Sequence, residues 1–287
     1  MKSVFINMAL VLSAITVFGQ NNTFDYFGFP SPGNKIELFA PGIISLENSK
    51  EYSLAISPSG DEVFFAVGTW PECKIMHVKK NGRHWSGPEI ASFSTDCYAV
   101  EPAFSPDGKY LYFSSSKGEK DVKQYCIWRL EKVGDQWGKG KKVIDIEDPD
   151  ILEFHPTITN NGTVYFCSWS LKTNKGSIYK SEHLNGVYSE PVKENVPFDE
   201  DCSVTNPFVE PDGKFIITST EIENSKSKYD VFISYHEEDG WAKPVSFGDR
   251  FNSSKVDDSF DVSPDGRFLF IYKQDNVYWT EAKGIIQ

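Results

Sequence analysis

The chain has 287 residues, of which 39% are hydrophobic and 24% charged, and this balance excludes both a multi-span membrane protein and a disordered chain. The formal net charge of −12 provides no counterion release against a phosphate backbone, so we expect no nucleic-acid partner. The 15% aromatic share, with 21 Gly and 16 Pro residues, favours strands and turns and predicts an all-β fold.

Residues 1–20 have the pattern of a secretory signal peptide. Lys2 is followed by a stretch from Val4 to Phe18 that is apolar apart from a few polar residues, and small residues precede the polar Gln20. The stretch is too short to span a bilayer comfortably. We therefore expect cleavage after Gly19 or Gln20 and an exported protein, periplasmic or extracellular, whose mature chain has no transmembrane span. An uncleaved anchor is the alternative.

A four-residue turn motif recurs along the rest of the chain. In one copy, Ser105 to Gly108, Pro presets φ at the first turn position, Asp suits the second, and Gly takes the positive φ that follows. Successive copies are separated by about 50 residues, a period that indicates a repeat architecture. The copies are Ser57–Gly60, Ser105–Gly108, Thr159–Gly162, Glu210–Gly213 and Ser263–Gly266.

Each turn motif is followed by an apolar run, such as Tyr110 to Phe113, which indicates a strand buried on both faces. A second run comes about a dozen residues later. A Gly-bearing turn then leads to an aromatic residue and a more polar fourth strand, as at Gly134 and Trp137. Four antiparallel strands in a unit of about 50 residues are typical of a propeller blade. The predicted fold is therefore an all-β, five-bladed β-propeller.

The fifth repeat ends after its third strand, so another segment must complete the ring. Residues 36–45 resemble a fourth strand, and we predict that this N-terminal strand closes the last blade and removes an exposed sheet edge. The segment from about Asn21 to Asn34 is expected to be a linker. Residues 21–287 then form a single domain, with blades at approximately 51–95, 96–150, 151–201, 202–255, and 256–287 plus 36–45.

The segment from Ser105 to Ser114, and its echo from Ser263 to Tyr272, resemble the repeat of TolB-type, WD-like β-propeller proteins. The similarity covers about residues 36–287. The resemblance implies an exported binding or accessory protein, although propeller folds host many functions.

In a propeller, the first strand of each blade lines the central channel, and its side chains alternate between the channel and the blade core. Positions six and four residues before each turn motif should then face the channel, and every blade has a polar side chain at one of them. A solvated channel without a ligand explains these residues. The functional interpretation is a ligand site that includes Glu51, Glu101, Glu153, His155, Asn206 and Asp257.

Four of these residues, Glu51, Glu101, Glu153 and Asp257, are carboxylates expected to converge at one channel mouth. Together they would hold a hard cation such as Ca²⁺ or share protons at raised pKa values. In a carbohydrate-active enzyme, a glycoside hydrolase or lyase, Glu101, Glu153 and Asp257 would be catalytic, because glycoside hydrolysis uses two carboxyls about 5 to 10 Å apart. His155 would hydrogen-bond Glu153 or a channel water, and a single His cannot make a multi-histidine metal site.

The loops between second and third strands should share a face with the loops that lead into each first strand. They carry Trp70 and Trp169, which suit stacking on sugar rings or protein side chains. The alternative is that each Trp packs against its own loop. We expect a protein or polysaccharide ligand at this face, over the channel.

The cysteines show no metal-binding or redox spacing. Cys126 and Cys167 lie in apolar runs, as buried thiols do, whereas Cys73, Cys97 and Cys202 lie in polar stretches, where an exported protein can pair two of them. No nucleophile-elbow, phosphate-loop or zinc-protease motif is present. The sequence therefore favours a binding or scaffold module over an enzyme.

Overall fold

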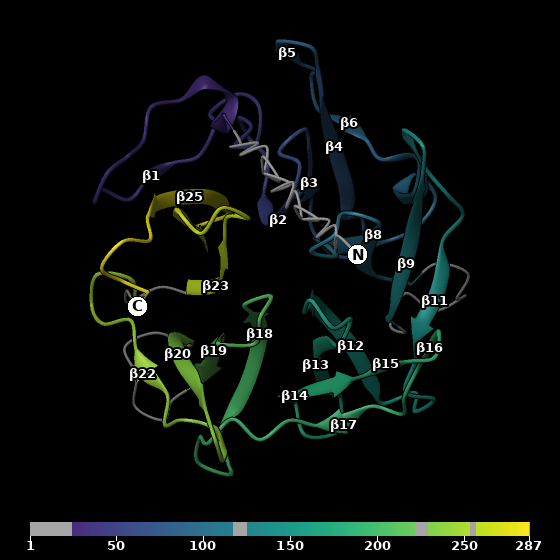
Figure 1. Cartoon of the computed structure of the whole chain (residues 1–287), viewed down its shortest axis with the longest axis vertical. Coiled ribbons are helices and arrows are strands. Elements are labelled where there is room, and N and C mark those ends of the chain that lie inside the picture. Colours follow the sequence, from purple (N-terminus) through teal and green to yellow (C-terminus); the bar gives the residue numbers. More distant parts are fainter. Residues whose placement is uncertain (1–24, 117–124, 222–228, 253–256, 287) are drawn as a thin grey trace, which may run out of the picture.

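The computed structural model describes residues 25–116, 125–221, 229–252 and 257–286, with only the backbone for 257–259. It confirms the predicted fold: antiparallel sheets are arranged around a common axis as the five blades of a propeller (Figure 1). Helical structure in the described residues is limited to two short 3-10 turns, η1 (Tyr26–Gly28) and η2 (Ser92–Ser94).

The first four blades follow one another along the chain, each from its innermost strand outward. Blade 1 contains β2 (Glu51–Ile56), β3 (Glu62–Val67), β4 (Lys74–Asn81), β5 (His84–Trp85) and β6 (Glu89–Ile90). Blade 2 contains β7 (Ala99–Phe104), β8 (Tyr110–Ser115), β9 (Cys126–Val133), β10 (Gln136–Trp137) and β11 (Lys141–Ile144). Blade 3 contains β12 (Ile151–Ile158), β13 (Val164–Ser170), β14 (Lys175–Ser181) and β17 (Val192–Lys193), with the small ribbon β15 (His183–Leu184) and β16 (Val187–Tyr188) beside them.

Blade 4 contains β18 (Ser203–Val209), β19 (Phe215–Glu221), β20 (Asp230–Glu237), β21 (Gly240–Trp241) and β22 (Val245–Ser246). Blade 5 contains β23 (Asp257–Val262), β24 (Phe268–Lys273), β25 (Asn276–Glu281) and the N-terminal β1 (Glu37–Leu38). The innermost strands β2, β7, β12, β18 and β23 contact one another in turn and close a ring. Apolar second strands fill the space between blades, as where Phe64 packs in one buried cluster with Leu111 and Phe113.

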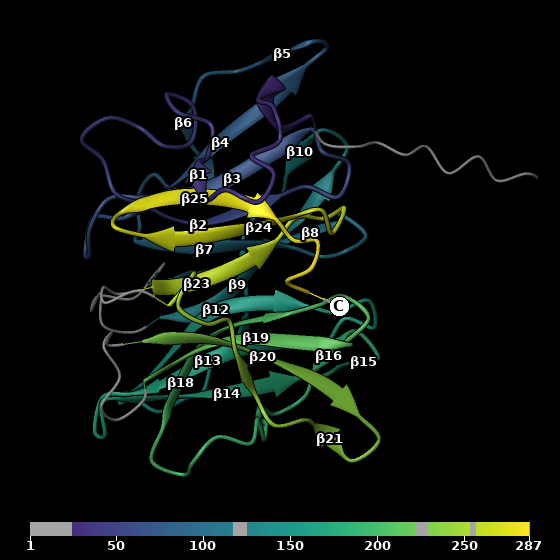
Figure 2. The ribbon, with the colours of Figure 1, turned by 90° about the vertical axis from the view of Figure 1, so that its left-hand side faces the viewer.

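The five turn motifs form the hairpins between the first and second strands, as predicted. Their glycines have φ between +69° and +85°, a region that residues with a Cβ avoid. The serine at the start of the motif stabilises the turn, because Ser105 Oγ accepts a hydrogen bond from Tyr110 N at 2.9 Å. We call the face that carries these turns the hairpin face, and the opposite one the loop face. Figure 2 shows the strands running between the two faces.

The N-terminal segment closes blade 5. In β1, Glu37 pairs with Trp279 and Leu38 with Tyr278 of β25. The strand is shorter than predicted because the chain turns inward after Leu38: Phe39 N still donates to Val277 O at 2.8 Å, but the Phe39 ring is fully buried. Burial of this ring thus ends the strand and anchors the segment.

The segment expected to be a linker packs against blade 5 where it is described. Tyr26 is buried, with its ring centroid 4.5 Å from that of Phe268 and 5.5 Å from that of Trp279. Its hydroxyl donates a 2.7 Å hydrogen bond to Asp265. Aromatic packing and a partly buried hydrogen bond therefore hold part of the segment that the sequence predicts to be a linker.

Every innermost strand contains a β-bulge near its middle, where the register with the second strand shifts. In four blades a residue at the bulge has positive φ: Ser53 at 62°, Glu101 at 55°, His155 at 53° and Asn206 at 49°. A bulge adds one unpaired residue and re-aims the side chains around it. The simple alternation between channel and blade core therefore fails at the positions chosen as site candidates.

Candidate functional site

A central cavity of about 870 Å³ lies on the propeller axis, lined by residues from the innermost strands of all five blades. It lies at the hairpin face, since prolines of four turn motifs also line it. Phe104, Phe208 and Phe270 contribute to its apolar wall. The turn prolines are Pro58, Pro106, Pro211 and Pro264.

Glu101 and His155 lie together at the inner end of this cavity. Glu101 Oε2 accepts hydrogen bonds from His155 N at 2.6 Å and Ser114 Oγ at 2.9 Å. His155 Nδ1 is 3.7 Å from Glu101 Oε1, and Glu101 N donates to Ser53 Oγ at 3.2 Å. Blades 1, 2 and 3 are thus tied together, and the Glu101 carboxylate is held in one orientation. His155 faces Glu101, and Glu153, one of the two partners expected for it, lies elsewhere.

Asp261 is a cavity residue that the sequence analysis missed. It lines the central cavity, and its Oδ2 accepts a 2.6 Å hydrogen bond from the buried Tyr272 hydroxyl. Burial raises the pKa of Asp261, and the nearby His155 opposes that effect. Asp261 lies two residues before its turn motif, where the other blades have Ala55, Ala103, Thr157 and Phe208. Asp261 could have been recognised from the sequence, because it is the one charged residue at a repeat position that is uncharged in the other four blades.

Glu51 and Glu153 do not line the central cavity. Both side chains are almost fully buried, at 1% exposed, and each accepts a hydrogen bond from the backbone of the loop before its own strand. Leu46 N donates to Glu51 at 3.3 Å, and Ile146 N donates to Glu153 at 2.7 Å. The bulge separates them from the channel positions, so the predicted convergence with Glu101 does not form. The side chain of Asp257 lies outside what the structure describes.

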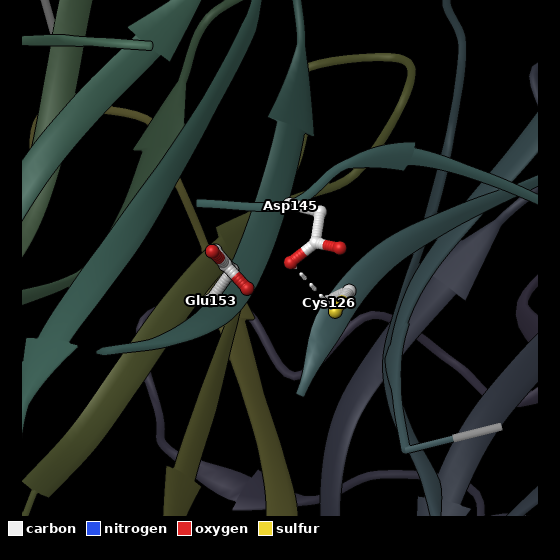
Figure 3. Close-up of side chains that lie close together, drawn as sticks. All are labelled: Cys126, Asp145 and Glu153. Carbon is white, nitrogen blue, oxygen red and sulfur yellow. Dashed lines mark hydrogen bonds between the residues drawn. The ribbon is translucent and has the colours of Figure 1, made fainter. Parts of the chain in front are cut away.

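Glu153 belongs to a compact group with Cys126 and Asp145, whose side chains point toward one another (Figure 3). Their ligand-type atoms all lie within 4.8 Å of one another. Burial raises the pKa of Glu153 to about 8. Burial, together with the charges of Glu153 and Asp145, raises the pKa of the Cys126 thiol well above its usual range.

The protein itself satisfies each member of this group. Cys126 Sγ donates a hydrogen bond to Asp145 Oδ1 at 3.4 Å, and Lys142 Nζ lies 2.5 Å from Asp145 Oδ2. Glu153 accepts a hydrogen bond from the Ile146 N–H. These interactions explain the group as a contact between blades 2 and 3. The Ca²⁺ site expected from four converging carboxylates has no counterpart among the described residues.

A second, smaller pocket of about 240 Å³ lies on the loop face, which we call the loop-face pocket. Trp169 and Asn206 line it, as does Glu101, which reaches both cavities. Trp70, by contrast, is 53% exposed, and its indole N–H donates to the Tyr125 hydroxyl. Trp70 lines neither cavity, so the structure brings together Glu101, Trp169 and Asn206 but not Trp70.

Comparison with solved structures identifies the architecture. A protein assigned as TolB from Agrobacterium tumefaciens superposes with a TM-score of 0.53 at 15% sequence identity, over 79% of this chain and 69% of that chain. The fold is a TolB-type β-propeller. TolB from Acinetobacter baumannii matches with a TM-score of 0.48 at 16% identity, over 81% of this chain and 54% of that chain.

An ancestral GH74 enzyme matches with a TM-score of 0.45 at 19% identity, over 80% of this chain and 33% of that chain. The match to the Agrobacterium tumefaciens protein, at 15% identity, establishes the fold and not an activity. No family model matches the chain, and no curated protein sequence matches it.

Within the described residues, no helix is long and apolar enough to cross a bilayer. All five cysteines are free thiols, so the disulfide that the sequence allowed between two of Cys73, Cys97 and Cys202 is not formed.

Proposed function

We propose that this protein is an exported binding module that holds a segment of a partner polypeptide in the central cavity at the hairpin face. The observation that carries the proposal is the cavity itself. At about 870 Å³ it lies within the range of about 300 to 1,000 Å³ typical of ligand sites, which are mostly apolar with a few convergent polar groups. Glu101, His155 and Asp261 are the convergent groups here.

The lining favours a polypeptide over a glycan. The wall is built from proline and phenylalanine side chains, and charged residues of both signs, among them Asp212, Arg267 and Lys283, lie at the cavity. Such a surface suits the mixed side chains of a peptide. The tryptophans that suited sugar stacking, Trp70 and Trp169, are outside this lining. The carbohydrate-active enzyme considered as the alternative loses the pairing of Glu101 with Glu153, because Glu153 lies between blades 2 and 3. Glu101 and Asp261 are the two carboxyls that share the central cavity.

A display selection tests the binding proposal. Peptides enriched on the wild-type protein should not bind Ala103→Arg, which places a long charged side chain inside the cavity. Val133→Arg, at an exposed position in the same blade, is the matched control and should bind normally. A glycan array run in parallel gives the competing outcome. Peptides that bind both variants equally, or glycans that bind where no peptide does, would refute the proposal.

Export is supported by the composition of residues 1–20, which lie outside the described residues. The expected result is a protein in the extracytoplasmic fraction whose N-terminus, by chemical sequencing, is Gln20 or Asn21. A cytoplasmic protein that keeps residues 1–20 would contradict export while leaving the binding proposal intact.

A further inference from the structure

The loop-face pocket has a lining suited to a cation. Among the described residues, the lining includes three aromatic side chains, Phe154, Trp169 and Tyr229, and the carboxylate Glu101. The other described lining residues, Cys167, Thr205 and Asn206, are uncharged. Aromatic ring faces and a carboxylate attract the same kind of ligand, because the ring quadrupole is negative over its face.

We propose that the loop-face pocket binds an organic cation of the alkylammonium class, such as a trimethylammonium group. The pocket volume of about 240 Å³ accommodates a group of this size and is below the range of about 300 to 1,000 Å³ typical of sites for larger ligands. The net charge of −12 adds a long-range attraction for cations. This site opens on the opposite face from the polypeptide site of the central cavity, and the two share Glu101.

Close packing between blades 3 and 4 fixes the base of the loop-face pocket. Gly176 of β14 lies so near β18 that a Cβ there would be 2.6 Å from Thr205 Cγ2 and 3.1 Å from Cys167 Sγ. Both of these residues line the pocket. The absence of a side chain at Gly176 therefore allows the two blades to meet.

The aromatic wall and the carboxylate are also held by their neighbours. Trp169 lies near the end of β13, between Leu152 of β12 and Gly176 of β14. The Phe154 ring centroid is 5.1 Å from that of Tyr125. Glu101 is oriented by the hydrogen bonds from His155 N and Ser114 Oγ. A pocket whose groups are already in place loses less conformational entropy when a ligand binds.

Titration calorimetry with choline and with its neutral carbon isostere, 3,3-dimethylbutan-1-ol, tests the charge preference directly. The two molecules have the same shape, so an apolar pocket would bind both alike. We expect saturable binding of choline below about 50 mM and at least about tenfold weaker binding of the isostere. Equal affinities, no choline binding, or binding of a disaccharide in place of choline would each overturn the proposal.

Variants locate the binding site. Trp169→Leu keeps an apolar side chain but removes the ring, and should weaken choline about tenfold, whereas Trp169→Phe should retain most of the affinity. Leu171→Ala, at an exposed position on the same face but outside the pocket, is the control and should not change it. Thermal unfolding of each variant verifies folding. If Leu171→Ala weakens choline as much as Trp169→Leu does, the assignment to this pocket is wrong.

Discussion

At the scale of single residues, the bulge positions connect backbone conformation with the site. Residues other than Gly and Asn rarely occupy positive φ, at a cost of about 1 to 2 kcal/mol each. Glu101 and His155 do so here, and each then donates its backbone N–H to the side chain of the preceding blade, Ser53 or Glu101. The strained conformation is offset by these links, which place two polar side chains at the axis.

Asn206 provides a test of this backbone requirement. In urea unfolding, Asn206→Val should have a free energy of unfolding about 1 to 2 kcal/mol lower than that of Asn206→Gly, because a β-branched residue is disfavoured at φ 49°. At Val204, two residues earlier and without positive φ, the order should reverse, so that Gly is the poorer residue. If Val and Gly rank alike at both positions, the bulge conformation does not limit stability.

Glu153 predicts a pH dependence of stability. Its pKa rises to about 8 in the folded protein through burial, from about 4.3 when unfolded. The folded state therefore binds the proton more tightly, and this stabilisation is complete below about pH 4 and is lost as the pH rises to about 8. Wild type should thus lose on the order of 3 kcal/mol between about pH 5 and 8 relative to Glu153→Gln, which stays neutral.

Urea unfolding at both pH values measures this difference. Glu89→Gln, a substitution at an exposed position in blade 1, should have the same pH dependence of stability as wild type. If the free energy of unfolding changes equally with pH in wild type and Glu153→Gln, the Glu153 carboxyl is not desolvated.

At the scale of elements, closure of blade 5 depends on more than strand pairing. Only two residues of β1 pair with β25, while Phe39 behind them is fully buried among Phe270 and Trp279. Removing residues 36–45 would reopen a sheet edge and expose this cluster, so thermal unfolding of the whole ring should shift to lower temperature.

A pair of point variants separates packing from pairing. Phe39→Ala should destabilise the protein by about 3 to 5 kcal/mol, as expected for a large side chain lost from a core. Leu38→Ala, at a residue 37% exposed, should change stability by no more than about 0.5 kcal/mol. Equal effects in denaturant unfolding would mean that the Phe39 ring does not anchor the segment.

The elements also show which features local sequence can predict. Turn chemistry is local, so the hairpins at Gly60 and its equivalents, the blade count and the closing strand followed from the sequence. The residues that line the channel were predicted less accurately, because the regular alternation of side chains used to choose them is interrupted by the bulge. Pro102 and Pro156, directly after Glu101 and His155, carried the missing signal, since proline inside a strand marks an edge or a bulge.

At the scale of the whole molecule, two cavities meet at one carboxylate. The central cavity at the hairpin face and the loop-face pocket both include Glu101. The sequence indicated the loop face and its Trp169, but not the larger cavity at the other end of the channel. That cavity forms only when five turn motifs and residues 281–286 come together in space, and no single segment encodes such an assembly.

Amide hydrogen exchange with a peptide from the display selection tests whether the central cavity is the binding site. We expect slower exchange around this cavity, in the innermost strands after their bulges and in the turns at Ser57–Gly60 and Ser105–Gly108. Exchange in the loop-face segments at Gly68–Cys73 and Ser170–Asn174 should not change. Protection confined to those loop-face segments, or no protection at the hairpin face with the peptide at saturation, would show that the cavity does not hold the peptide.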